Sequence, residues 1–165
     1  MDSAHRGNTG EFYVLAELSR RGWIAAQTSR NARAFDILAR NGGRQVAIRV
    51  KTTMWKESMF RWNVKKNGEI FSELGPNDYS VLVEIPEAIE QYPVFYIVPS
   101  RTIESWLTAD YDTWVRTPGM RGQPHDPSNK VRLFYLDGDD SKIGRGYRGR
   151  LEPYLQKWDI LEGNE

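Results

Sequence analysis

Hydrophobic and polar residues alternate along residues 45–53, QVAIRVKTT. In a strand, side chains two residues apart share a face, so the apolar face would hold Val46, Ile48 and Val50. Arg49 and Lys51 would then be neighbours on the polar face. Like charges placed side by side repel unless anions lie between them. The polar face of this strand is therefore expected to bind an anion.

Residues 35–40, FDILAR, precede this strand and favour a second one. The residues between the two strands, Asn-Gly-Gly at 41–43, are typical of a tight turn. We therefore predict an antiparallel hairpin. In that hairpin Asp36 comes to lie roughly opposite the end of the partner strand that carries Arg49 and Lys51.

The pattern also predicts three helices. The first is expected over 8–21, with Thr9 as its N-cap. The second is expected from 102 to about 114, with Ser100 as its cap. The third is expected over 151–161, with Pro153 in its first turn.

Further strands are expected at 23–28, 60–66, 78–85, 93–99 and 131–136, and a Pro- and Gly-rich loop at 117–130. The order of these elements predicts one domain over residues 1–165. Its fold class would be α/β or α+β, with a mixed central sheet flanked by helices.

Composition narrows the class of protein. The formal net charge is +1, so any cationic site must be local rather than a property of the whole surface. The absence of cysteine excludes disulfides and thiolate metal sites. The N-terminal residues contain no secretory apolar region, and the apolar stretches are of strand length. We expect a cytoplasmic protein with no membrane segment.

Three residues suggest chemistry. Glu11 lies one turn into the first expected helix, Asp36 near the start of a strand, and Lys51 near the end of its partner. Aspartate is disfavoured in strands, so its pairing with a lysine favours a site over a structural role. Glu11 alone is more often explained as a solvated carboxylate that suits the helix dipole.

The segments GNTGEFYVLAELSRRGW, AFDILAR, VAIRVKTT and YLQKWDIL together resemble the PD-(D/E)XK nuclease superfamily. The resemblance is to small bacterial members that begin with a G-x-x-GE helix and end with Y-x-x-x-W-D-x-L. It implies a restriction endonuclease-like fold and a DNA endonuclease that uses Mg²⁺ or Mn²⁺ on duplex or branched DNA. It also implies a homodimer, which many such nucleases form to cut two strands.

The resemblance assigns roles to individual residues. Asp36 would be the principal metal ligand, Glu11 an auxiliary ligand or a neighbour of the ligands, and Lys51 the cation that faces the phosphate. Hard divalent cations prefer such carboxylate oxygens. A bound metal polarises the scissile phosphate and activates water, while a cation stabilises the developing charge.

Arg49 departs from the family pattern, which usually has Glu or Gln two residues before the lysine. Arginine has no acceptor atom and stays charged, so it cannot be a metal ligand. Three outcomes are open. Arg49 pairs with Asp36 and fills the metal site; or the missing ligand comes from elsewhere, Glu84 or Gln45; or Arg49 holds a phosphate while Asp36 and Glu11 hold one metal.

Cations beside this site predict a nucleic-acid-binding face made of Arg30, Arg33, Thr52, Lys65 and Lys66. Scattered surface cations are an equally common explanation. Trp55 and Trp62 lie near these cations, where they could stack on bases or belong to the core. Three functions therefore compete: a metal-dependent DNA endonuclease, an inactive relative that binds nucleic acid or protein, and a partner-binding protein with no nucleic-acid role.

Overall fold

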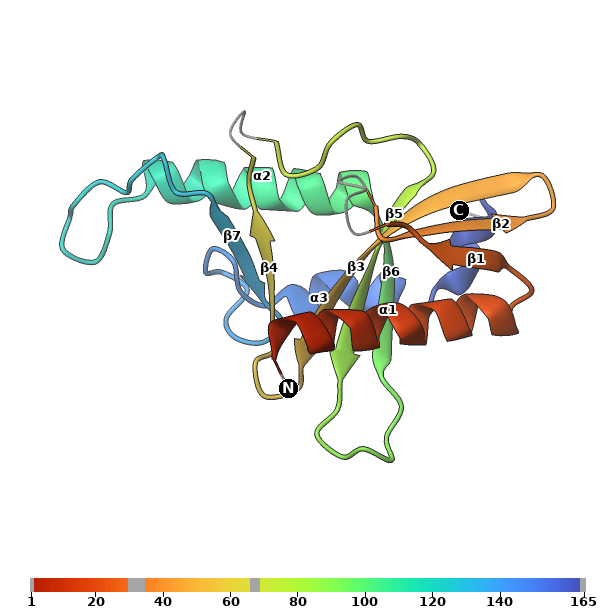
Figure 1. Ribbon diagram of the computed structural model, residues 1–165. Helices are drawn as coiled ribbons and strands as arrows, with labels where there is room; N and C mark the ends of the chain where they lie inside the picture. Colours follow the sequence, from red (N-terminus) through yellow and green to blue (C-terminus); the bar gives the residue numbers. More distant parts are fainter. Residues whose placement is uncertain (1, 30–34, 66–68, 164–165) are drawn as a thin grey trace.

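The computed structural model describes residues 2–29, 35–65 and 69–163. Figure 1 shows the arrangement of its elements along the chain. They are α1 (Ser3–Arg20), β1 (Ile24–Gln27), β2 (Ile37–Asn41), β3 (Arg44–Met54), β4 (Met59–Asn63), β5 (Asp78–Ile85), β6 (Val94–Pro99), α2 (Ser100–Arg116), β7 (Val131–Tyr135), α3 (Tyr147–Leu151) and the 3₁₀ helices η1 (Glu152–Tyr154) and η2 (Trp158–Glu162).

The predicted hairpin forms, and it belongs to a five-stranded sheet with the order β1-β2-β3-β5-β6. The β3 and β5 strands are parallel, whereas the other neighbours are antiparallel, so the sheet is mixed. Ile37 pairs with Ile48, and this register places Asp36 beside the middle of β3, next to Ile48 and Val50. Strands β4 and β7 form a separate two-stranded sheet.

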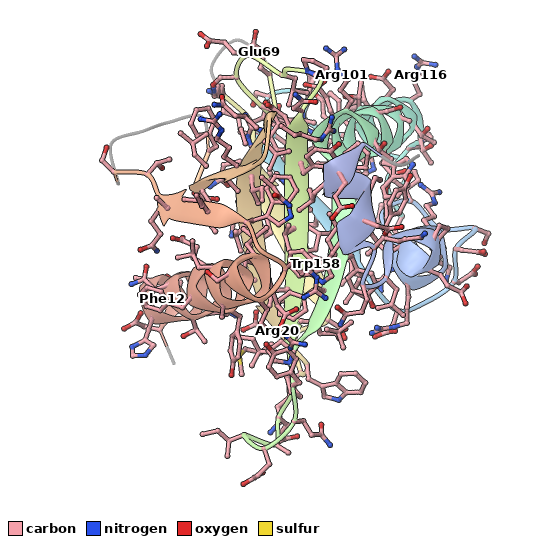
Figure 2. The ribbon with its side chains drawn as sticks, turned by 90° about the vertical axis from the view of Figure 1, so that its right-hand side faces the viewer. Phe12, Arg20, Glu69, Arg101, Arg116 and Trp158 are labelled. Atoms are coloured by element: carbon pink, nitrogen blue, oxygen red, sulfur yellow. The ribbon has the colours of Figure 1, made fainter. Side chains whose placement is uncertain are left out.

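Two hydrophobic cores cover the two faces of the sheet. On one face α1 contributes Val14 and Leu18, which pack against Val46 and Ile48 of β3. On the other face α2, α3, β4 and β7 pack over β5 and β6 around residues such as Phe134. Figure 2 shows the sheet between the α1 layer, which carries Phe12, and the α2 layer, which carries Arg101 and Arg116.

Both long helices begin earlier than the hydrophobic pattern indicates. The N-cap of α1 is Asp2, whose carboxylate accepts a hydrogen bond from His5 N at 2.8 Å. Thr9 lies inside the helix, where its hydroxyl donates to His5 O. The α2 helix starts at Ser100, whose buried hydroxyl bonds Ser80 Oγ at 2.9 Å instead of capping the helix. Polar first turns carry no apolar periodicity, which is why the prediction began too late.

The predicted helix over 151–161 is wrong as a continuous element. Its chain forms the end of α3, then η1 and η2, with Pro153 near the start of η1. Gln156 between the two 3₁₀ helices adopts φ 53°, which is incompatible with a continuing right-handed helix. The predicted helix had an apolar stripe of Leu155, Trp158 and Leu161. Trp158 and Leu161 are buried in the α1-side core, whereas Leu155 is 45% exposed. Within the described ranges, no helix is long and apolar enough to cross a membrane.

Candidate functional site

Asp36 occupies the position immediately before β2, where the pairing with β3 stops. Its backbone N–H donates to Ile48 O at 2.9 Å. Its Oδ2 accepts a hydrogen bond from the Val50 N–H at 2.7 Å. The carboxylate therefore takes the place of the next backbone acceptor in the ladder, and this bond fixes its orientation relative to β3.

Glu11 comes close to Asp36 because α1 packs tightly on β3. The contact is made by Gly10, which lies against the side chain of Thr52. Glu11 accepts a hydrogen bond from Gln27 Nε2 at 2.8 Å. Glu11, Gln27 and Asp36 line one hollow of about 270 Å³, together with Asn8. We call it the acidic hollow.

A second hollow, of about 220 Å³, opens on the other side of Asp36. Its lining contains three cations, Arg49, Lys51 and Lys65, and we call it the cationic hollow. Aromatic rings of Phe35, Trp62 and Phe71 also line it. Asp36 thus stands between a hollow rich in oxygen ligands and a hollow rich in positive charge.

Lys51 lies half-buried in the cationic hollow, with its Nζ 5.9 Å from the centroid of the Trp62 ring. Burial lowers the pKa of Lys51, because desolvation disfavours the charged ammonium, and the negative charge of Asp36 opposes this shift. The structure therefore brings Asp36 and Lys51 to one hollow, as the hairpin predicted, and Asp36 acts electrostatically on Lys51.

Arg49 turns toward β5 rather than toward Asp36. Its Nη1 donates to Asp78 Oδ2 at 3.2 Å, and its Nη2 donates to Ser72 O at 3.1 Å. The guanidinium also lies over the Phe71 ring, 4.9 Å from the centroid. Arg49 is only 8% exposed. Of the three outcomes left open for Arg49, the pairing with Asp36 is not the one that forms. Arg49 pairs with Asp78, which sequence reasoning did not consider.

The two residues considered as replacement ligands lie elsewhere. Glu84 is 1% exposed and accepts hydrogen bonds from Arg148 at 3.1 and 3.2 Å. It lines neither the acidic nor the cationic hollow. Gln45 pairs with Arg40 near the turn of the hairpin, at the end of β3 away from Lys51. Neither residue is brought to Asp36 in this arrangement.

The predicted nucleic-acid face is described only in part. Lys65 lines the cationic hollow, whereas Arg30, Arg33 and Lys66 lie outside the described residues. Thr52 Oγ1 is buried, and no hydrogen-bond partner for it occurs within the described chain. Trp55 is exposed, while Trp62 is 2% exposed and belongs to the core.

Sequence reasoning also missed Asn8, Gln27 and Asp78. Asn8 and Glu11 lie three residues apart on α1, so they share one face of the helix. This spacing could have indicated that Asn8 lies beside Glu11. Asp78 meets Arg49 through parallel pairing of β3 with β5, which joins segments distant in sequence. No local pattern reveals that register.

The oxygen ligands of the acidic hollow suit a magnesium ion whose remaining coordination positions are filled by water and substrate. No group of three or more His, Cys, Asp or Glu side chains is placed to hold a metal among residues 2–29, 35–65 and 69–163. Magnesium commonly uses one or two carboxylates, several waters and substrate phosphate oxygens. Glu11 and Asp36 supply two carboxylates lining one hollow, which fits this mode and not an all-protein cage.

Comparison with solved structures finds proteins of similar architecture. The chain is similar to the bacterial homing endonuclease I-Ssp6803I, with a TM-score of 0.51 and 13% identity, over 98% of this chain and 93% of the other. It is also similar to Hjc, a Holliday junction resolvase from Archaeoglobus fulgidus, with a TM-score of 0.49 and 16% identity, over 96% and 97%. No protein-family model and no curated protein matches the sequence.

Identities this low show the fold and leave the activity open. The mixed five-stranded sheet and its flanking helices agree with the fold class predicted from the sequence. The chain therefore has a restriction endonuclease-like fold.

Proposed function

We propose that this protein is a Mg²⁺-dependent endonuclease that acts on DNA phosphodiester bonds. The observation that carries the proposal is the position of Asp36 between the acidic hollow and the cationic hollow. A phosphodiester placed beside Asp36 would have oxygen ligands for a metal on one side and lysines for its negative charge on the other. The nuclease fold is consistent with this assignment.

The chain's own groups account for binding and orientation. Glu11 and Asp36 would hold the metal, and the Val50 N–H keeps the Asp36 carboxylate in one orientation. The metal would polarise the phosphate and lower the pKa of bound water. Lys51 would stabilise the charge that develops on the phosphate oxygens, in a partly desolvated place where a cation acts more strongly than in water. Lys65 would contact a neighbouring phosphate.

Cleavage assays with one variant and a matched control test the proposal. Wild-type protein with Mg²⁺ or Mn²⁺ is expected to cut linear duplex, supercoiled or branched DNA, and D36N is expected to abolish cutting. Asp112 is an exposed aspartate of α2, remote from both hollows, so D112N is expected to cut like wild type. Intact DNA of all three kinds with wild type, or equal cutting by D36N, would remove the proposal.

A second function is favoured by one specific observation. The residue two before Lys51 is an arginine engaged with Asp78, so this site has one carboxylate fewer than the family pattern. An inactive protein that binds nucleic acid or protein through the same surface would keep the cations without the metal. Such a protein would bind a fluorescein-labelled duplex at low salt, would bind no Mn²⁺, and would leave the DNA uncut.

A homodimer, proposed from the family resemblance, is tested by the mass of the protein in solution with and without DNA.

A further inference from the structure

We propose that Arg49 is a positioning residue that fastens the segment 69–77 as a wall of the cationic hollow, and that Asp78 keeps its guanidinium away from Asp36. This inference rests on the proposed function. Arg49 would then be neither a lost metal ligand nor a cation that fills the metal site.

Arg49 fastens the segment by two directed contacts and one packing contact. Its two terminal nitrogens donate to Asp78 Oδ2 and to Ser72 O, at 3.2 and 3.1 Å. Its planar face covers the ring of Phe71, which is itself buried. A guanidinium presents a rigid fork of donors, so one side chain can hold two partners in fixed positions, which a lysine does poorly.

Asp78 is well placed to receive this charge. It is the first residue of β5 and pairs with Ala47, two residues before Arg49 on the same face of β3. Its other oxygen, Oδ1, lies on the segment side, because a β-carbon built on Gly75 would be 3.3 Å from it. The aspartate therefore links β3 to the end of the segment that it terminates.

A second arginine holds the same segment from α2. Arg101 donates to Leu74 O at 3.2 Å. Figure 2 places Arg101 and Glu69 at the same end of the molecule. Between the two fastened carbonyls, Glu73 adopts φ 54°, a left-handed conformation that costs free energy in a non-glycine residue. The surrounding contacts must maintain this backbone, and Arg49 provides those on the side of the hollow.

The pairing has an electrostatic consequence for Asp36. Arg49 extends from the same face of β3 as Lys51, and both line the hollow that Asp36 shares. An unpaired guanidinium there would attract the Asp36 carboxylate and repel a divalent cation. Asp78 neutralises it in a largely buried ion pair. Two lysines then remain to attract phosphate.

The variant R49Q tests the fastening. Amide hydrogen exchange within 70–77 is expected to accelerate roughly tenfold, which corresponds to about 1.4 kcal/mol of local opening free energy. The affinity for a fluorescein-labelled DNA duplex in EDTA should fall, while Mn²⁺ affinity stays within about twofold of wild type. Exposed Arg116 in the last turn of α2 gives the matched control R116Q, which should change none of these. Unchanged exchange in R49Q, or Mn²⁺ binding at least about tenfold tighter, would overturn the inference.

The variant D78N tests whether Asp78 keeps the Arg49 guanidinium away from Asp36. It can also be used if R49Q fails to fold. It frees the guanidinium while keeping the shape of the side chain. We expect Mn²⁺ affinity, measured by electron paramagnetic resonance, to fall roughly tenfold or more because Arg49 then pairs with Asp36. The double variant R49Q/D78N should recover that affinity. Unchanged Mn²⁺ affinity in D78N would overturn this role of Asp78. If wild type binds no Mn²⁺, the proposed function fails, whereas hydrogen exchange still decides whether Arg49 fastens the segment.

Discussion

Gly10 of α1 lies directly against Thr52 of β3. A β-carbon built on Gly10 would overlap Thr52 Oγ1 and would lie 3.0 Å from Thr52 Cβ. Only glycine permits this approach without displacing the helix or the strand. Because Glu11 is the next residue, the same contact sets how deeply Glu11 reaches toward the hollow that Asp36 lines.

The variant G10A should therefore lower both stability and metal affinity. Overpacking a well-filled contact costs about 1–3 kcal/mol, which denaturant unfolding would measure. Moving α1 outward should also weaken Mn²⁺ binding by Glu11 and Asp36. Gly7 lies in the same helix with no atom near its built β-carbon. The control G7A should raise stability by about 0.5–1 kcal/mol, the helix preference of alanine over glycine. Equal effects of G10A and G7A would contradict the packing argument.

Glu11 should contribute to metal binding less than Asp36 does. Its carboxylate already accepts a hydrogen bond from Gln27, whereas Asp36 is fixed at the sheet by Val50. The variant E11Q is expected to weaken Mn²⁺ binding and slow DNA cleavage without abolishing either, while D36N abolishes both. Glu90, in the exposed β5–β6 loop, supplies the control E90Q, which should match wild type. Full Mn²⁺ affinity in E11Q would remove Glu11 from the site.

Glu84 should prove to be a structural residue. It is buried, and Arg148 donates to both of its carboxylate oxygens. The variant R148M leaves an uncompensated buried carboxylate and should destabilise the fold by about 3–5 kcal/mol. The reciprocal variant E84Q should leave Mn²⁺ affinity unchanged, because Glu84 lines neither hollow. A loss of Mn²⁺ binding in E84Q would restore Glu84 as a candidate ligand.

Local patterns were sufficient for the part of the site built by one hairpin. The alternation of 45–53 and the turn at 41–43 placed Asp36 near Lys51, because a short turn fixes the register of two strands. They could not place Arg49 relative to Asp78, because that contact depends on a parallel pairing across the intervening β4 and segment 69–77. The helix over 151–161 failed for a related reason. Its apolar stripe correctly marked Trp158 and Leu161 as buried, but both residues belong to the single 3₁₀ helix η2, where a spacing of three residues also places side chains on one face.

Lys51 should make stability depend on pH in the alkaline range. Burial lowers its pKa below the ordinary value of 10.5, with Asp36 opposing the shift. Between the lowered folded pKa and 10.5 the unfolded chain binds more protons, so the free energy of unfolding rises with pH in that window. Below the folded pKa the cost of the buried charge is present in full.

The variant K51M removes this charge. It should be more stable than wild type at neutral pH, and its advantage should shrink as the pH rises toward 10.5. The variant K51R stays charged throughout the window and should lack the rise with pH. Urea unfolding of the three proteins at several pH values measures the effect. An advantage of K51M that stays constant with pH would show that Lys51 is not held in a desolvating site. Because K51M also removes the proposed phosphate cation, it should lose DNA cleavage while gaining stability, the opposite of a merely structural lysine.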